Sequence, residues 1–411
     1  MHTKHYERII TACCFLFLFV NIGLPSTSFS VYQPYLVTLP GVGDAGGSLI
    51  LSARTLTSFA AMFLVGAYLN RLDVRAGAAV GCFLTGAGFI VYSFASSLPA
   101  FLAAAVLTGF GYGLGGMVGM TLLMNRWYKS RVATSIGIAT VGSGVASIVM
   151  PIVILPIIHG LSLQAAFRFE AALAIVFGIV VFAFLRNYPE DVGAEPFHLP
   201  DAPEEKRGSK AHDVDLDALE PLPRRMRILL LVAMVITGAF CLGGMGYLSV
   251  NLTSVGFDSV FAGTMVSVAG AALTVSKFTA GEVIDHAGPR KGTLMLFSIL
   301  IVGTALCCLP FLHSPVLSAA GTALFGFGTS IGSVGISLWA LELSDAAHRT
   351  RTVRNFQICY SLGGFLFNLF PGVLKELTGS YAVIYVILLV CGVIAAATIL
   401  HAYRRYRPEM G

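Results

Sequence analysis

Charged residues are scarce in this sequence. Asp, Glu, Lys and Arg make up 11% of its 411 residues, whereas a soluble domain carries about 25%. Apolar residues make up 56%, and so large a share cannot be placed in the interior of a water-soluble globule. The composition therefore excludes a soluble globular protein and predicts a polytopic membrane protein.

Motifs for metal binding, disulfide bonding and catalysis are also lacking. No two of the eight cysteines have C-x-x-C spacing, and all lie in apolar segments, which is typical of small buried residues. No P-loop is present, which argues against a pump driven by ATP. Two patterns, G-x-G-x-x-G at 111–116 and G-x-S-x-G at 328–332, lack the preceding strand that a nucleotide site or a nucleophile elbow requires. We therefore expect no cofactor, no metal site and no enzyme activity.

Long apolar runs dominate the rest of the chain. Their length predicts helices and not a membrane β-barrel. The expected fold is an all-α membrane protein with twelve transmembrane helices in two six-helix halves. The expected spans are 8–35, 47–69, 76–95, 98–124, 131–158, 163–186, 224–254, 259–284, 291–312, 314–342, 350–378 and 381–403.

A polar stretch at 187–223, rich in Pro, Asp and Glu, separates the two sets of spans. It predicts a cytoplasmic linker between an N-terminal half, 1–186, and a C-terminal half, 224–411. Most of the 26 Lys and Arg residues fall in the termini, in the linker and in alternate loops. The positive-inside rule then places both termini in the cytoplasm. The basic residues left over are Arg54, Arg168, Lys277 and Lys375.

The two halves repeat one another. GAYLNRLDVRAG at 66–77 is matched by GEVIDHAGPRKG at 281–292, and TGFGYGLGG at 108–116 is matched by FGFGTSIGS at 325–333. The first pair is offset by 215 residues and the second by 217. Two like halves are typical of a transporter whose site lies between them near the bilayer midplane.

Lys277 lies inside an expected span, after a run of uncharged residues at 261–276. A cation there costs about 2.5–3.5 kcal/mol on insertion scales and therefore usually faces protein or water. Two readings are open: the lysine snorkels or pairs with a carboxylate, or it binds an anion.

The repeated loop resembles the signature of the major facilitator superfamily, in which Gly, Asp, Gly and a basic residue join paired helices. The resemblance implies a conformational role for Asp285 and Arg290, and for Arg71 and Arg75 in the first-half copy. That copy carries Asn70 where the family usually has Asp. Glu342, close to Arg349 and Arg351, predicts a gate salt bridge on the cytoplasmic side.

Within the superfamily, the sequence is most similar to the monocarboxylate transporters and the oxalate–formate antiporters. NRWYKSRVATSIGIATVGSGVASIVMPIV at 125–153 and FPGVLKELTGSY at 370–381 carry this likeness. Those families have a cation in the eighth helix, four residues before the loop glycine, where Lys277 stands before Gly281. It is usually arginine and binds the substrate carboxylate. This chain departs from the pattern at Leu273, where a carboxylate is common, and has no lysine in its first helix or deep in its eleventh.

Other polar residues lie within the expected spans, and each has more than one possible role. Arg54 forms a second cationic contact or an outer electrostatic funnel, or it pairs with a carboxylate such as Glu170 as an architectural bond. Glu170 is a candidate proton carrier only by elimination. Pro25 and Pro34 are expected to break or bend the first helix, which favours a cavity position for its polar residues. The remaining candidates line the cavity or are ordinary interhelical packing: Tyr32, Gln33, Tyr112, Tyr247, Asn251, Trp339, Gln357 and Tyr360.

The sequence thus predicts a secondary transporter for a small organic anion, with a monocarboxylate as the expected substrate, driven by a co-transported proton or by anion exchange. Its other expected partner is the lipid bilayer, and no nucleic acid is expected. The protein is expected to be a monomer in a bacterial inner membrane. The alternative is a drug or neutral-metabolite transporter in which Lys277 is structural. A membrane sensor or enzyme is a third reading, which the lack of a catalytic constellation disfavours.

Overall fold

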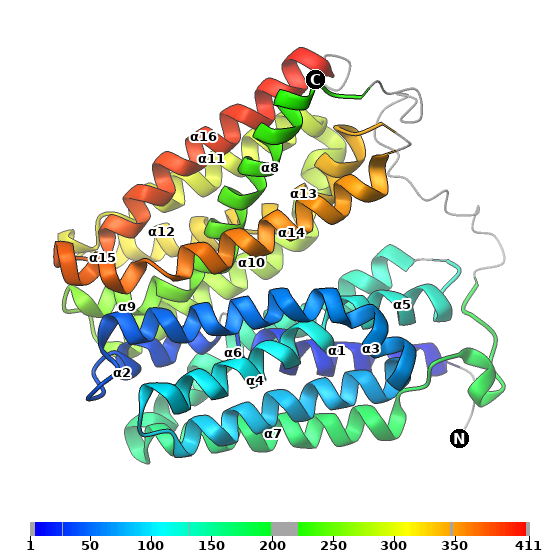
Figure 1. Cartoon of the computed structure of the whole chain (residues 1–411), viewed down its shortest axis with the longest axis horizontal. Coiled ribbons are helices and arrows are strands. Elements are labelled where there is room, and N and C mark those ends of the chain that lie inside the picture. The colour runs from blue at the N-terminus through cyan, green and yellow to red at the C-terminus, as the bar shows by residue number, and fades with distance from the viewer. Residues whose placement is uncertain (1–4, 27, 131, 199–220, 346–347, 408–411) are drawn as a thin grey trace. The chain divides into compact units, whose positions relative to one another are not determined.

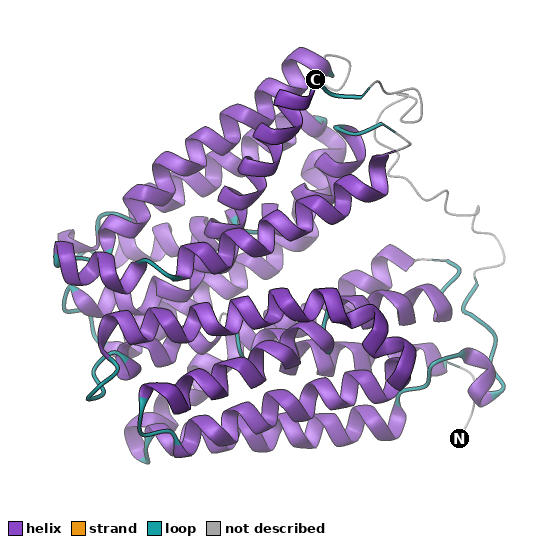
Figure 2. Cartoon of the chain, in the orientation of Figure 1, coloured by secondary structure: helices purple, strands orange, loops and turns teal. Residues whose placement is uncertain are grey.

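The computed structural model describes residues 5–26, 28–130, 132–198, 221–345 and 348–407, and leaves aside the side chains of 28, 132–134, 281–283, 285–286, 334, 337, 341 and 349–350. Within that part of the chain the regular structure is helical (Figure 2), apart from one isolated bridge between Tyr128 and Phe197. The all-α membrane fold expected from the sequence is confirmed.

The chain forms two compact units. The first comprises 1–29, 40–42 and 53–207, and the second comprises 30–39, 43–52 and 208–411. The helices of the first unit (Figure 1) are α1 (Tyr6–Leu18), most of α3 (Gly43–Phe94), α4 (Leu98–Leu114), α5 (Met117–Trp127), α6 (Val132–Gly160) and α7 (Leu163–Phe184).

The second unit contains the short α2 (Gln33–Leu36) and the start of α3. Its other helices are α8 (Arg224–Gly238), α9 (Leu248–Ser254), α10 (Ser259–Ala287), α11 (Pro289–Cys307), α12 (Pro315–Gly328), α13 (Ile331–Glu342), α14 (Arg349–Asn368), α15 (Pro371–Thr378) and α16 (Ala382–Tyr406).

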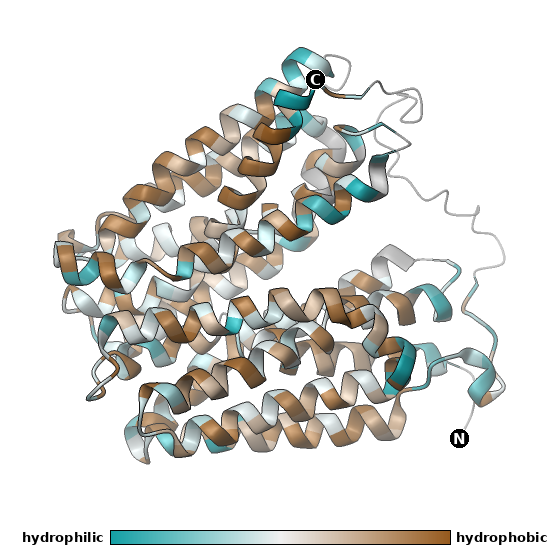
Figure 3. Ribbon diagram, in the orientation of Figure 1, coloured by the Kyte–Doolittle hydropathy of each residue, from teal (hydrophilic) through white to brown (hydrophobic). Residues whose placement is uncertain are grey.

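Among the described residues, eleven helical segments are long and apolar enough to cross a membrane. Figure 3 shows their apolar bodies in brown and the hydrophilic residues gathered at helix ends. One of them, α3, has 52 residues, more than twice the roughly 20 that a span needs. Both expected spans, 47–69 and 76–95, lie in α3, one on each side of the non-helical residue Asp73.

The two parts of α3 run in opposite directions. Its residue Asp73 has φ 59° and ψ 175°, which is not helical. Glycines of α4 touch both parts: Gly109 and then Gly113 meet Arg54 and then Ser58, whereas Gly111 and then Gly115 meet Thr85 and then Gly81. As the residue number rises along α4, the number of the contacted residue rises in the first part of α3 and falls in the second part. The chain therefore turns back at Asp73.

The contacts of these glycines repeat in the second unit. A Cβ at Gly109 would lie 2.5 Å from the Arg54 carbonyl oxygen, and a Cβ at Gly326 would strike the carbonyl oxygen of Ala269. Arg54 and Ala269 are 215 residues apart, and Gly109 and Gly326 are 217 apart. The residues of the first-unit contact and those of the second-unit contact are therefore related by the same offsets as the sequence repeat. Close packing through small residues is what these glycines provide.

The turn at Asp73 has its counterpart at Gly288, again 215 residues later. Gly288 ends α10 and precedes α11 with φ 84°. Glycine adopts positive φ without steric cost, whereas other residues do not. In the first unit Asp73 holds this conformation, and its carboxylate accepts a hydrogen bond of 2.9 Å from the Ala76 amide.

The first span of each half is broken. After α1 a π-helical turn (Phe19–Gly23) leads through a turn to a 3₁₀ segment (Ser28–Tyr32) and α2, so the break expected from Pro25 and Pro34 is confirmed. After α8 a π-helical turn (Ala239–Gly243) and a 3₁₀ turn (Gly244–Tyr247) lead to α9. Nothing in the sequence analysis predicted this second break, which has no proline. π-turns are frequent at functional sites.

Replacing Asp73 by alanine and by glycine distinguishes the effect of backbone strain from the effect of the capping hydrogen bond. Asp73→Ala loses the cap, which costs about 1 kcal/mol, and keeps the unfavourable backbone. Asp73→Gly loses the same bond but relieves strain of about 1–3 kcal/mol. Thermal unfolding midpoints in detergent should therefore fall for the alanine variant and stay level or rise for the glycine variant. Equal midpoints for the two variants would contradict this account.

We also expect Gly326→Ala and Gly109→Ala to lower the unfolding midpoint, because each new methyl group meets backbone of a neighbouring helix. Overpacking of this kind costs about 1–3 kcal/mol. Gly66→Ala is the matched control, since a Cβ at Gly66 has nothing within 4 Å and alanine favours the helix. The contact account fails if the control falls as far as the other two.

Candidate substrate site

Lys277 lies in α10, within the membrane-spanning segment Ser259–Ala280, and its side chain is half-buried. The residue before it, Ser276, is fully buried and its hydroxyl lies 2.5 Å from that of Ser330. Ser330 stands in the short break between α12 and α13. This hydrogen bond holds the helix carrying Lys277 against that break.

The break exposes the start of α13 to its neighbours. In the break, the Thr329 hydroxyl donates a hydrogen bond of 2.7 Å to the Gly326 carbonyl oxygen. In the first turn of α13, a Cβ at Gly332 would lie 2.6 Å from the Tyr360 hydroxyl and 2.8 Å from the Cys241 sulfur. Glycine is needed here because two side chains from other helices occupy that space.

Four elements of the second unit thus converge on the start of α13. They are α10 at Ser276, α14 at Tyr360, the π-turn at Cys241 and the break itself. The first turn of a helix carries partial positive charge from its backbone amides, and broken helices use such ends to meet anionic substrates. A lysine one residue from Ser276 adds a full positive charge to this region. The arrangement is suited to an anion.

Gln357 lies three residues before Tyr360 on α14 and is half-buried, as Tyr360 is. Residues three apart share one face of a helix. The structure therefore brings these two candidates together, on the face of α14 that meets Gly332.

Other candidates of the second unit make interhelical contacts. The Tyr247 hydroxyl donates to Ser48 at 3.1 Å and to the Asn368 carbonyl oxygen at 3.3 Å. The Asn251 amide donates to the Cys307 carbonyl oxygen at 3.1 Å, and the Trp339 indole donates to Thr293 at 3.0 Å. Gln33 donates to the Gly47 carbonyl oxygen at 3.2 Å, beside the fully buried Tyr32. These contacts correspond to the packing alternative of the sequence analysis.

The first unit holds Arg54 and Glu170. Arg54 is 7% exposed on α3, and Glu170 is fully buried on α7. The close approach of Gly109 brings α4 against Arg54. Tyr112 is half-buried.

The loop residues fall into different surroundings. Arg75 donates to the Phe182 carbonyl oxygen at 2.8 Å and lies over the Phe182 ring at 4.7 Å, which ties α3 to the end of α7. Arg71 is exposed and Arg290 is the second residue of α11. The side chain of Asp285 lies outside the described residues.

Glu342 ends α13 and is buried. Its carboxylate accepts the Tyr403 hydroxyl at 2.5 Å, and its backbone carbonyl accepts the Arg407 guanidinium at 3.1 Å. These contacts join α13 to the end of α16. Of the predicted partners, Arg349 has its side chain outside the described residues, and Arg351 lines a pocket described below.

Asn21, in the π-turn that follows α1, is a buried polar residue that the sequence analysis did not single out. Its amide donates to the Gly115 carbonyl oxygen at 2.7 Å, and its own carbonyl accepts the Thr85 hydroxyl at 3.0 Å. It therefore links three helices of the first unit. The available signal was a lone Asn in an apolar run, since a buried amide needs partners.

Comparisons with known proteins agree with this architecture. The family model described as Major Facilitator Superfamily matches residues 11–367 and 228–411. Monocarboxylate transporter 12 of Rattus norvegicus is 27% identical over 351 residues, covering 79% of this chain and 70% of its own. Monocarboxylate transporter 13 of Bos taurus is 26% identical over 327 residues, covering 79% and 72%.

Solved structures share the fold at low identity. A crystal structure of the nucleoside transporter NupG superposes with a TM-score of 0.73 at 14% identity, covering 98% of this chain and 100% of that one. A bacterial homolog of the human lysosomal transporter Spinster, inward-facing and unoccupied, gives 0.71 at 15% identity, with 99% of each chain covered. The chain belongs to the Major Facilitator Superfamily and is an integral membrane protein that transports a small molecule, not an enzyme.

Proposed function

We propose that this chain is a secondary active transporter that moves a small organic anion, a monocarboxylate, across the membrane by alternating access. The observation that carries the proposal is the place of Lys277. It stands within a membrane-spanning helix, beside a contact with the break before α13. The names of the curated relatives, monocarboxylate transporters 12 and 13, support the same substrate class.

The charge of Lys277 supplies a physical basis for coupling. An ammonium group in a span costs about 2.5–3.5 kcal/mol on insertion scales. A bound carboxylate neutralises it, so that closing the cavity around the loaded site costs less than closing it around the empty one. Lysine offers a point charge in place of the bidentate fork of arginine, and hydrogen bonds from Tyr360 and Gln357 would orient the anion.

The energy source is either a proton moving with the anion or a second anion moving the other way. Glu170, buried in the first unit, is the candidate proton carrier. Arg54, a buried cation of the first unit, is a candidate second contact. We further propose that the protein is a monomer in a bacterial inner membrane. Both termini would lie in the cytoplasm, an orientation that the distribution of Lys and Arg supports.

Contacts at the start of α3 support an outer gate for alternating access. Within the second unit, the Asp44 carboxylate accepts the Tyr381 hydroxyl at 2.6 Å, and Ser48 accepts the Gly372 amide at 2.6 Å. A Cβ at Gly372 would strike the Asp44 carbonyl oxygen. These contacts join the first-half segment 43–52 to α15 and α16. Alternating access requires such contacts to break when the site opens toward this side.

Transport by Lys277→Gln tests the anion site. Uptake of labelled lactate, pyruvate, formate, acetate and oxalate into proteoliposomes should show accumulation of one acid by the wild type and loss of at least about tenfold in the variant, since the site then lacks its cation. Lys277→Arg should keep partial activity. An imposed inside-alkaline gradient should drive accumulation if a proton moves with the acid and not if anions exchange.

Lys375→Gln is the matched control for lost positive charge. Lys375 caps the end of α15 by donating to the Gly379 carbonyl oxygen at 2.6 Å, and its variant should transport as the wild type does. If Lys277→Gln transports as well as the control, the monocarboxylate proposal fails at its centre. Transport of a neutral or amphipathic compound by that variant would then favour the alternative in which Lys277 is structural.

Tyr381→Phe tests the outer gate. It removes a hydrogen bond to a carboxylate, worth about 1.5–3 kcal/mol, which shifts the equilibrium toward the outward-open state by roughly tenfold or more. A cysteine at Gln33 in a cysteine-free background should then react several-fold faster with an impermeant maleimide. Tyr385→Phe is the control, because it loses a hydrogen bond of 3.0 Å to Gly244 within the C-terminal half. Equal acceleration by both variants would contradict the gate.

A further inference from the structure

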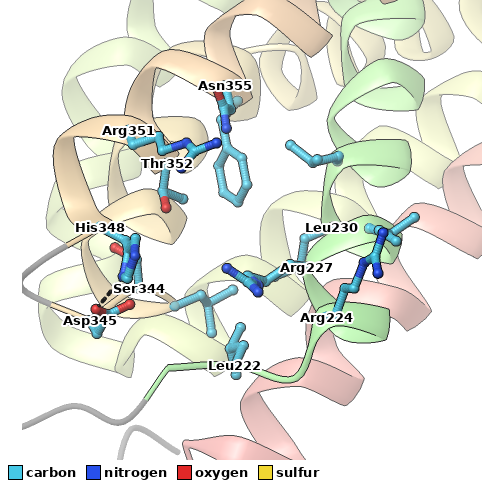
Figure 4. Close-up of a pocket in the computed structure, with 14 residues that line it drawn as sticks. Leu222, Arg224, Arg227, Leu230, Ser344, Asp345, His348, Arg351, Thr352 and Asn355 are labelled. Atoms are coloured by element: carbon cyan, nitrogen blue, oxygen red, sulfur yellow. Dashed lines mark hydrogen bonds and ion pairs between the residues drawn. The ribbon is translucent and has the colours of Figure 1, made fainter.

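A basic cavity lies in the second unit, apart from Lys277. Its volume is about 400 Å³, and it is bounded by the start of α8 and by the junction of α13 with α14 (Figure 4). Arg224 and Arg227 line it from α8, and Arg351 lines it from α14. Leu230 and Phe356, both buried, form part of an apolar floor. The cavity thus joins a cationic rim to an apolar wall.

The positive charge of this cavity exceeds its negative charge. The one acidic residue of its lining, Asp345, is paired with His348 at 2.7 Å. This hydrogen bond lowers the pKa of the Asp345 carboxyl. Among the described residues, the three guanidinium groups of the lining form no salt bridge. Guanidinium groups bind phosphate with paired, charge-assisted hydrogen bonds.

The cavity lies at a membrane surface. The spanning segments of α8 and α14 begin at Arg224 and Arg351, and the described part of the span that includes α13 ends at Ala340. Ile228 lines the cavity and is 51% exposed, and Leu229 and Val232 continue an exposed apolar face along α8 at 50% and 49%. A ligand with an anionic head and an apolar tail fits both features, whereas a free anion uses only the first.

We propose that this cavity binds the phosphate headgroup of an anionic phospholipid from the surrounding leaflet. The arginines hold the phosphate, and an acyl chain lies along the exposed apolar face of α8. The proposal does not depend on the transported substrate. Under the positive-inside assignment the leaflet is the cytoplasmic one, where anionic lipids attract basic residues.

Native mass spectrometry of the full-length, delipidated protein tests this assignment. Phosphatidylglycerol should be retained over phosphatidylcholine by the wild type. The variant Arg224→Gln/Arg227→Gln/Arg351→Gln should bind phosphatidylglycerol on the order of a hundredfold more weakly, since each arginine contributes about fivefold. Replacing all three by lysine should restore part of the affinity. Failure of the wild type to prefer phosphatidylglycerol would overturn the proposal.

The control Lys291→Gln/Arg404→Gln/Arg405→Gln removes the same charge from exposed positions outside the cavity. It should bind phosphatidylglycerol within about twofold of the wild type, and an equal loss would show diffuse surface attraction and overturn the proposal. Inorganic phosphate should compete poorly; full displacement would assign the cavity to a free anion instead. Should the triple variant lose its unfolding transition, Arg227→Gln alone should still weaken binding several-fold.

Two further outcomes separate this proposal from the transport proposal. Lys277→Gln should keep its phosphatidylglycerol, even if it loses transport. Displacement of phosphatidylglycerol by the transported acid would place the cavity on the substrate route and overturn the lipid assignment.

Discussion

The contact between Gly326 and the backbone of Ala269 sets the arrangement of the second unit. Because no side chain separates the two helices, α12 lies as close to α10 as backbones allow. That closeness brings the break after α12 within hydrogen-bonding reach of Ser276, the residue that precedes Lys277 on α10. The equivalent contact of Gly109 with Arg54 does the same for α4 and α3 in the first unit. The same kind of backbone contact therefore packs the helices that carry Arg54 and Lys277.

The broken helices depend on the same closeness. A π-turn widens a helix locally, and the one at Ala239–Gly243 lies where a Cβ at Gly243 would strike the Phe367 ring. Its neighbour Cys241 reaches the first turn of α13, where Gly332 leaves room for it. The proposed site therefore contains irregular backbone at points where helices approach closely. Such backbone is tolerated at membrane depth only where protein or water surrounds it.

The sequence predicted the helical class, most spans and the repeat, because apolar runs and glycine spacing are local signals. The place of the turn at Asp73 was predicted, since it falls between the expected spans 47–69 and 76–95, but the positive φ of Asp73 was not, because no glycine stands at that position. The second π-turn was missed because the apolar run there contains no proline. Tyr247, Asn251 and Trp339 show a different limit: a polar residue in a span needs a partner, but the sequence does not say whether that partner is a substrate or, as here, Ser48, Cys307 or Thr293.

The backbone at Asp73 also restricts how this protein can change in evolution. At φ 59° and ψ 175° the Asp73 backbone lies in a region that essentially only glycine occupies. A β-branched residue at this position would meet a much larger penalty, so most single substitutions there would be lost. The corresponding turn of the second half already has glycine at 288. The second half therefore makes this turn without strain, whereas the first half makes it with a strained aspartate.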